Sequence, residues 1–321
     1  MKRMKKISVV LFVSLLLLAG CSKKNKDEIT IGVLQWAQHP ALNDSLEGMM
    51  EGLKQAGLEN ANVQIKVVNE DASTATMAAS QFVSQGVDLI FTIATPAAQT
   101  ALVAVENTNI PVVFSAVTDA KAAGLVENID SPEGAITGVS DLPPVKKQLE
   151  LMKTMFPEMK KLGILFNTSE ANSTSQIEEV KKIASPLGIE IVTQGISKPS
   201  ELAIAAAQIT KSVDAIYIIP DNTIASQAGL VVNQASELKV PVFMAESGQF
   251  DQGILATDSI SYKSLGIQAG IMIKEILVDK KPIQSIPVQT AQETELIISQ
   301  KMADELGIQI PKELLERAEI R

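Results

Sequence analysis

The chain has 321 residues, 46% of them hydrophobic, and a formal net charge of −9. About 300 residues are more than one hydrophobic core usually organises, so the length indicates two lobes. The acidic balance argues against a nucleic-acid partner, because phosphate binding needs clustered Lys and Arg. The chain has a single histidine and no acidic cluster with EF-hand spacing, so we expect no metal, no cofactor and no histidine-based triad.

The N-terminus has the order of an export signal. Four basic residues lie within residues 2–6, an apolar run follows over 7–19, and this run is shorter than the roughly 20 residues of a membrane span. Leu18-Ala19-Gly20-Cys21 resembles a bacterial lipobox, in which a signal peptidase cuts before the cysteine and the thiol then carries diacylglycerol. We therefore expect a signal peptide over 1–20, lipidation of Cys21 and a tether over 21–28. The alternative is a buried free cysteine beside an uncleaved anchor.

A lipid on Cys21 would hold the mature chain on the extracytoplasmic face of the cell membrane. Residues 1–20 contain four of the 28 basic residues and none of the 37 acidic ones, so the mature chain has a net charge near −13. Since Cys21 is the only cysteine, no disulfide is expected, and the two lobes must be stabilised by their cores.

Short apolar runs alternate with amphipathic segments through the first half of the chain. This alternation predicts βαβ units and a parallel sheet, and the nearly continuous apolar character of the strands predicts helices on both faces. Ser73 is a candidate N-cap of one of the helices. The predicted strands are 29–35, 63–68, 87–94, 111–116 and 136–139, and the predicted helices are 41–56, 73–85 and 96–105.

The same rhythm restarts after a break at Asp141-Leu142-Pro143-Pro144, so the fold class is α/β with two doubly wound, Rossmann-like lobes. A helix over 264–277 has small residues on one side, which suits close packing. The last segment is too short for a third domain, so we expect it to cross between the lobes and complete both. Here the predicted strands are 162–166, 189–192, 213–219, 240–244, 286–288 and 296–298, and the other predicted helices are 145–155, 175–184, 200–211, 223–237, 302–306 and 312–317.

Ligands of open α/β sheets bind off the carboxyl ends of the strands, so residues directly after strands are the candidates. Thr95 starts a helix after an apolar strand, and the free N–H groups of that first turn suit a carboxylate; plain N-capping by Thr95 is the alternative. Asp221 follows another strand and could pair with an ammonium group, cap the next helix, or do both. Glu246, one strand over, could share that cation.

Gln35 and Trp36 follow the first predicted strand. A tryptophan beside a cleft can stack on a planar or aromatic ligand, and the alternative for Trp36 is packing against the turn at His39-Pro40. The histidine itself is expected to be a turn residue. No Walker-type loop, no GxSxG elbow and no GxGxxG is present, so no enzyme signature accompanies these residues.

Several segments resemble the ABC-transporter substrate-binding lipoproteins of the tryptophan/tyrosine-binding type. The resemblance covers the mature chain, with one departure at Ala120, where proline is expected. It lies in the lipobox and in Ile93-Ala-Thr-Pro-Ala-Ala-Gln99, Phe114-Ser-Ala-Val-Thr-Asp119, Gly138-Val-Ser-Asp141, Asn167-Thr-Ser-Glu-Ala-Asn-Ser173 and Asp221-Asn-Thr-Ile-Ala225.

This resemblance implies a type I periplasmic-binding-protein fold with three crossings between the lobes and hinge closure on the ligand. It implies an N-lobe of 29–140 plus about 260–285 and a C-lobe of 141–259 plus about 286–321. The implied site residues are Thr95, Ala97, Ser115 and Ala116 for an α-carboxylate, Asp221 and Glu246 for an α-ammonium, and Asn172 and Ser173 in a polar loop that faces the cleft. Asn222 is a further candidate because it lies, with Asp221, directly after a predicted strand.

The resulting expectation is a monomeric, lipid-anchored binding protein that captures an aromatic amino acid and presents it to an ABC permease with a cytoplasmic ATPase. A nucleoside- or sugar-binding lipoprotein on the same scaffold is the alternative, although only 3% of the residues are aromatic. A surface-anchored enzyme using Asp221 and Glu246 is a third possibility. A cytoplasmic regulator shares the fold, but this chain lacks a DNA-binding headpiece and has an export signal.

Overall fold

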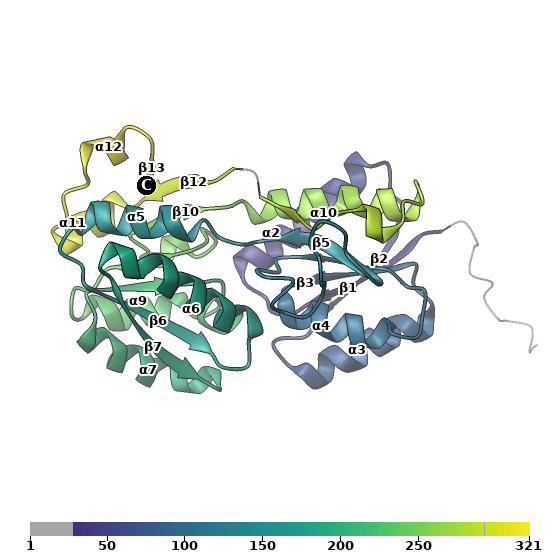
Figure 1. Ribbon diagram of the computed structural model, residues 1–321, viewed down its shortest axis with the longest axis horizontal. Helices are drawn as coiled ribbons and strands as arrows, with labels where there is room; N and C mark the ends of the chain where they lie inside the picture. Colours follow the sequence, from purple (N-terminus) through teal and green to yellow (C-terminus); the bar gives the residue numbers. More distant parts are fainter. Residues whose placement is uncertain (1–27, 292) are drawn as a thin grey trace, which may run out of the picture.

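A computed structural model describes residues 28–291 and 293–321. The chain forms two α/β lobes that lie side by side (Figure 1). The N-lobe has a parallel six-stranded sheet in the order β11-β5-β4-β3-β1-β2. Its strands are β1 (Thr30–Gln35), β2 (Asn62–Val67), β3 (Leu89–Ile93), β4 (Val112–Ser115), β5 (Ile136–Ser140) and β11 (Gln289–Thr290), and its helices are α2 (Pro40–Gln55), α3 (Ala72–Gln85), α4 (Thr95–Val105) and α10 (Tyr262–Leu277), with a 3₁₀ turn at Ile283–Ser285.

The C-lobe has a seven-stranded sheet in the order β13-β12-β10-β9-β8-β6-β7, in which only the β10–β12 pair is antiparallel. The strands are β6 (Lys161–Asn167), β7 (Glu190–Ile196), β8 (Ala215–Ile218), β9 (Val242–Met244), β10 (Ala256–Ser259), β12 (Glu295–Ile298) and β13 (Glu319–Ile320). The helices are α5 (Val145–Met155), α6 (Ala171–Ala184), α7 (Leu202–Ile209), α8 (Asn222–Ala225), α9 (Ala228–Ser236), α11 (Gln300–Leu306) and α12 (Lys312–Leu315), with 3₁₀ turns at Ser185–Leu187, Pro199–Glu201, Thr210–Ser212 and Phe250–Gln252.

Central strands such as β3 and β8 are buried on both faces of their sheets, which is why they are apolar at nearly every position. In the C-lobe, Tyr217 and Phe243 point into one core cluster, whereas Ile216 and Val242 point into the other. Successive side chains of a strand alternate between faces, so both faces need apolar residues. The predicted α/β fold with two doubly wound lobes is therefore confirmed.

Helix α10 packs tightly on α2 through glycines. A Cβ added at Gly266 would lie 2.1 Å from the Ser45 carbonyl oxygen, and one at Gly270 would lie 2.6 Å from the Met49 carbonyl oxygen. The two helices thus approach closely enough for backbone contact, as the small residues of this segment predict. This contact fixes a late segment of the chain to the N-lobe.

The chain passes between the lobes after β5, after β10 and after β11 (Figure 1). Strand β11 pairs with β5 in the N-lobe sheet, with Gln289 opposite Val139. The chain therefore returns to the C-lobe between Thr290 and Glu295, later than the boundary expected near 286. The sequence pattern does not show this because both residues of β11 are exposed, whereas Ile286 is buried in the N-lobe core.

Other differences lie at the starts and ends of elements. Helix α3 is capped by Asp71, whose carboxylate accepts a hydrogen bond from the Thr74 N–H at 2.6 Å, and Ser73 is not its N-cap. Helix α6 starts at Ala171, four residues before the predicted start, and the predicted helix over 223–237 is divided into α8 and α9. Strand β10 was not predicted, because Thr257, Asp258 and Ser259 are polar although buried.

Candidate ligand site between the lobes

A cavity lies between the lobes at the carboxyl ends of the strands. Its volume is about 20 Å³, so side chains from the two lobes nearly meet across it. The N-lobe side and the second crossing contribute His39, Leu42, Thr95, Ala116, Thr118, Asp141 and Tyr262, and the C-lobe contributes Asn172, Pro220, Asp221, Asn222, Ala225 and Glu246.

Two carboxylates of this cavity each have one oxygen without a hydrogen-bond partner among the described residues. Asp141 Oδ2 accepts a hydrogen bond from the Tyr262 hydroxyl at 2.7 Å, whereas Oδ1 is buried and has no partner. Glu246 Oε2 accepts from the Gly248 N–H at 2.7 Å, whereas Oε1 is buried and has no partner. A buried acceptor without a partner costs free energy, so this pair calls for a donor from outside the protein.

Burial also governs the ionisation of these groups. It raises the pKa of Glu246 to about 8, and it raises the pKa of Asp141 although the Tyr262 hydroxyl partly offsets the effect. Burial lowers the pKa of His39 to about 4, so its imidazole is neutral at pH 7. Within residues 28–291 and 293–321, no Lys or Arg lines the cavity. An ammonium group placed between Asp141 and Glu246 would supply the missing donors and the missing positive charge.

Asp221 also lines the cavity, but both of its oxygens are used by the protein. Oδ1 accepts from the Ile224 N–H at 3.0 Å, and Oδ2 accepts from the Asn167 N–H and the Ser173 hydroxyl, each at 2.7 Å. This geometry is that of an N-cap on α8. The structure thus shows Asp221 as a helix cap, which is one of the two predicted roles. An ammonium group could bind this carboxylate only by displacing one of the three donors that it already has.

Glu170 is a further buried acid that the strand-end pattern did not single out. It accepts hydrogen bonds from the Asn222 backbone N–H at 3.1 Å and side-chain amide at 2.6 Å, from the Thr223 N–H at 3.2 Å, and from the Asn172 amide at 3.2 Å. Burial and the charge of Asp221 raise its pKa to about 8. Glu170 thereby orients Asn172 and Asn222, whose side chains line the cavity.

The first turn of α4 contributes Thr95 to the lining of the cavity. Ala94, with φ of 83°, occupies the cap position, and Thr95 is the first helical residue, so the N-capping alternative for Thr95 is wrong. Pro96 has no N–H, and the free N–H groups of this turn carry the positive end of the helix dipole. This end of the cavity suits a carboxylate.

The other predicted site residues lie outside the cavity lining. Trp36 is part of the N-lobe core, with only 8% of its surface exposed, as in the packing alternative. Gln35 donates to the Ala37 carbonyl and to Asn43, and Ser115 accepts from the Ser45 hydroxyl. Ala97 is buried, Ser173 donates to Asp221, and Cys21 lies outside the described residues.

Two of the residues missed by the sequence patterns, Asp141 and Tyr262, lie at crossings between the lobes. Asp141 directly follows β5, but because Pro143 and Pro144 come soon after it, the sequence pattern assigns this segment to the break between the lobes. Tyr262 starts α10 just after the second crossing. The lining residues that were missed are His39, Leu42, Thr118, Asp141, Pro220, Ala225 and Tyr262.

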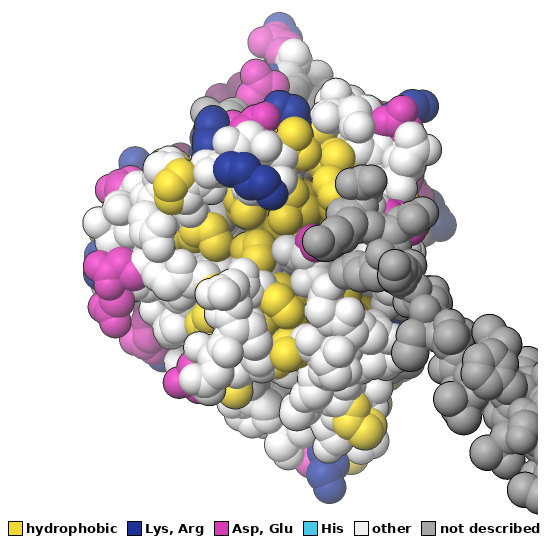
Figure 2. Space-filling view, turned by 90° about the vertical axis from the view of Figure 1, so that its right-hand side faces the viewer, with side chains coloured by type: hydrophobic (Ala, Val, Ile, Leu, Met, Phe, Trp, Pro, Cys, Tyr) yellow, Lys and Arg dark blue, Asp and Glu magenta, His cyan; other side chains and the backbone are white. Residues whose placement is uncertain are grey.

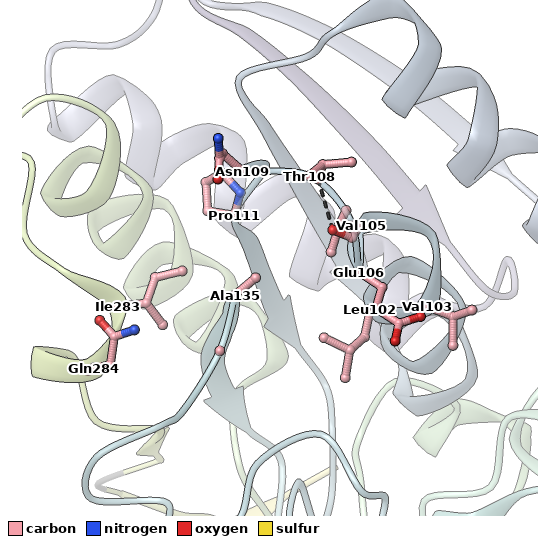
Figure 3. A pocket seen from close by; sticks show the side chains of 11 residues that line it. Leu102, Val103, Val105, Glu106, Thr108, Asn109, Pro111, Ala135, Ile283 and Gln284 are labelled. Atoms are coloured by element: carbon pink, nitrogen blue, oxygen red, sulfur yellow. Dashed lines mark hydrogen bonds between the residues drawn. The ribbon is translucent and has the colours of Figure 1, made fainter.

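A much larger hollow lies at the outer end of the N-lobe, beside the starts of β4 and β5. Its volume is about 740 Å³, and Leu102, Val103, Pro111, Ala135 and Ile283 give it an apolar lining (Figure 3). Figure 2 shows apolar side chains gathered on this end of the lobe. None of its described lining residues has a buried polar atom without a partner, so it lacks the feature that marks the interlobe cavity.

Two α/β lobes with polar side chains facing each other across a cavity are typical of binding proteins that close on a small molecule. The sequence matches the family of ABC transporter substrate binding proteins over residues 30–320, so the chain belongs to this family. It is 37% identical over 291 residues to the tyrosine-binding protein of Clostridioides difficile strain R20291, covering 90% of this chain and 83% of that protein. The protein is therefore the substrate-binding protein of an ABC transporter.

Two solved structures of about one-third identity are similar to this chain along nearly its whole length. One is an ABC domain in complex with L-Trp from Streptococcus pneumonia, with 35% identity, a TM-score of 0.87 and coverage of 92% of this chain and 100% of that one. The other is a ligand-free, open substrate binding protein with adhesive properties from Clostridium difficile, with 35% identity, a TM-score of 0.70 and coverage of 91% and 99%. At equal identity, this chain is more similar to the L-Trp complex than to the ligand-free, open structure.

Two further observations concern the described residues alone. None of their helices is both long enough and apolar enough to cross a membrane. Nor do they contain a group of three or more His, Cys, Asp or Glu side chains suited to holding a metal ion.

Proposed function

We propose that this protein binds an amino acid between its lobes, with the α-ammonium between Asp141 and Glu246 and the α-carboxylate at the first turn of α4. The observation that carries this proposal is the pair of buried, partnerless oxygens, Asp141 Oδ1 and Glu246 Oε1. Asp141 follows the last long N-lobe strand, and Glu246 follows a C-lobe strand. A cation shared by both lobes is bound best when they are closed, which is how a ligand drives closure.

An aromatic amino acid, tyrosine or tryptophan, is the proposed ligand class. It is supported by the relatives, one of which is described as tyrosine-binding and another as a complex with L-Trp. Tyr262 is the aromatic residue that lines the cavity, whereas Trp36 packs in the N-lobe core. The cavity is too small for an indole as the lobes lie here, so binding of such a ligand requires the lobes to move apart.

The proposal extends to the setting of the protein. Diacylglycerol on Cys21 would anchor it to the extracytoplasmic face of the membrane, and several acyl chains would make the anchor stable. The tether would keep a monomeric binding protein near its ABC permease, whose cytoplasmic ATPase drives transport, and would raise its effective concentration there. In this role the protein captures, closes and presents its ligand, and it catalyses no bond-breaking reaction.

Thermal-shift screening tests the ligand class. The purified mature protein is heated with each of the twenty amino acids and with common nucleosides, because a ligand that binds only the native state raises the melting temperature. Tyrosine or tryptophan should give the largest increase. An increase with nucleosides alone would replace the amino-acid proposal by the nucleoside alternative.

A matched pair of ligands tests the ammonium site. Calorimetry with tryptophan and with indole-3-propionate, which lacks only the α-ammonium group, compares binding with and without the proposed cation. We expect the second compound to bind at least 100-fold more weakly, because it leaves the buried carboxylate oxygens without donors. Equal affinity for the two compounds would show that Asp141 and Glu246 do not hold an ammonium group.

A further inference from the structure

A direct contact joins the lobes outside the ligand cavity. Glu70 lies between β2 and α3 of the N-lobe, and its carboxylate reaches α8 of the C-lobe. The Thr223 hydroxyl donates to Glu70 Oε2 at 2.6 Å. The Ser226 hydroxyl lies 3.3 Å from Glu70 Oε1, and its hydrogen has a closer acceptor in the Thr223 carbonyl oxygen at 3.1 Å. None of these three residues lines the cavity between the lobes. The contact therefore needs no ligand.

The backbone that carries Glu70 is held in an unusual conformation. Asn69 has φ of 50° and Glu70 has φ of 63°, so two successive non-glycine residues are left-handed. This conformation costs free energy for residues with a Cβ and persists only where surrounding contacts fix it. Here the Glu70 N–H donates to the Trp36 carbonyl at 2.8 Å, and Asp71 caps α3 directly afterwards. The loop thus directs the Glu70 side chain towards the other lobe.

The receiving side is organised in advance. Thr223 is fully buried, and its hydroxyl oxygen accepts a hydrogen bond from the Asn167 amide at 2.9 Å. The single hydroxyl hydrogen of Thr223 is therefore left to donate, and Glu70 at 2.6 Å is a much closer acceptor than Glu170 at 3.4 Å. A donor fixed in this way loses little freedom when the lobes close.

We propose that Glu70 is an interlobe latch, which stabilises the closed state of this protein through the Thr223 hydroxyl without touching the ligand. The inference rests on the proposed capture of a ligand by hinge closure. A contact present only in the closed state lowers the free energy of closure, so it raises affinity for every ligand that needs that state. Glu70 is in this sense a positioning residue for binding.

The population of the closed state can be measured without any ligand. Spin labels are placed on the mature protein carrying Cys21→Ser, at exposed positions of α3 and α7 (Met77→Cys and Ile204→Cys), and the distance between the lobes is measured by double electron–electron resonance. We expect a closed population in the protein with Glu70 and its loss in Glu70→Ala. Glu59→Ala is the control, since it removes an exposed charge from the same lobe and should leave the distribution unchanged.

Ligand binding supplies the second readout. Glu70→Ala should weaken binding of the screened amino acid about tenfold through faster dissociation, the loss expected for a hydrogen bond to a charged group. Thr223→Val should weaken it similarly, and the double variant Glu70→Ala/Thr223→Val should lose no more than either single one, because both remove one contact. An unchanged melting temperature would show that the fold is intact.

Three results would overturn the latch. One is a fully open ligand-free protein with Glu70 in place. Another is a distance distribution that Glu70→Ala leaves unchanged, even where affinity falls, because the carboxylate would then act on the ligand and not on closure. The third is additive losses in the double variant. If the protein binds no amino acid but Glu70→Ala still shifts the distance distribution towards the open state, the latch is supported and the proposed ligand class is wrong.

Discussion

The interlobe cavity is far smaller than the hollow at the outer end of the N-lobe, here called the outer groove, yet the cavity is the better candidate for a ligand site. The groove has a volume of about 740 Å³ and an apolar lining, whereas the cavity has about 20 Å³. Yet of these two hollows, the cavity alone has, among its described lining residues, buried carboxylate oxygens without partners. A large apolar pocket is the usual first choice for a ligand site. In a protein that closes on its ligand, unpaired buried acceptors are the better marker, because closure reduces the volume and leaves the polar groups.

The same comparison applies within the cavity. Asp221 and Glu246 both follow strands of the C-lobe, and both are buried. Three protein donors satisfy Asp221, whereas Glu246 has one donor, on one oxygen. The two acids should therefore respond to substitution in different ways, one in stability and the other in binding.

The largest effect is expected for Glu246→Gln. It keeps the size of the side chain but places an uncharged amide where the ammonium group would bind, and removing one partner of a buried charge pair typically costs about 2–5 kcal/mol. Binding of the amino acid should weaken at least 100-fold in calorimetry, a loss of about 3 kcal/mol. Glu237→Gln, an exposed residue of the same lobe, is the control. Unchanged affinity of Glu246→Gln would remove this residue from the site.

Asp221→Ala should act first on stability. It removes the cap of α8 and leaves the Asn167 N–H and the Ser173 hydroxyl without their acceptor, so we expect unfolding free energy to fall by about 2–4 kcal/mol. Urea denaturation measures this loss. A midpoint equal to that of the unsubstituted protein, together with abolished binding, would instead restore the role of ammonium partner that the strand-end pattern predicts for Asp221.

The pH dependence of stability should show the same buried acids. Burial raises the pKa of Glu246 from 4.5 to about 8, so its contribution to stability is fully present below 4.5 and is lost as pH rises through 8. Glu170 acts in the same direction. Burial lowers the pKa of His39 from 6.5 to about 4, so His39 reduces stability only as pH falls below 6.5. From pH 6.5 to 8.5 the melting temperature of the ligand-free protein should fall by about 3–6 °C.

Glu246→Gln separates the two acids in this measurement, because it should reduce the slope while Glu170 maintains the rest. An ammonium ligand favours the ionised form of Glu246, so binding near pH 7 should release about one proton. Calorimetry in two buffers of different ionisation enthalpy measures that release. A melting temperature that is flat or rising over this window would contradict the raised pKa values.

The sequence predicts the fold well because buried parallel strands need apolar residues at almost every position, as in β3 and β8. It does not predict β10, whose buried residues include Thr257, Asp258 and Ser259. The strand-end rule found Glu246 and Thr95 but not Asp141 or Tyr262, which lie at crossings between the lobes. The rule could not separate Glu246 from Asp221 either, since the count of donors on each oxygen depends on residues far away in the chain, such as Asn167.

The smallest effect is expected in the outer groove. Val103 is 73% exposed and lines only that hollow, at the opposite end of the N-lobe sheet from the cavity. Val103→Ser makes the groove more polar without removing a buried contact, and surface substitutions of this kind usually change free energies by no more than about 0.5 kcal/mol. Amino-acid affinity in calorimetry should therefore stay within about twofold. A larger loss of affinity would show that the groove is coupled to closure of the lobes, and both hollows would then take part in ligand binding.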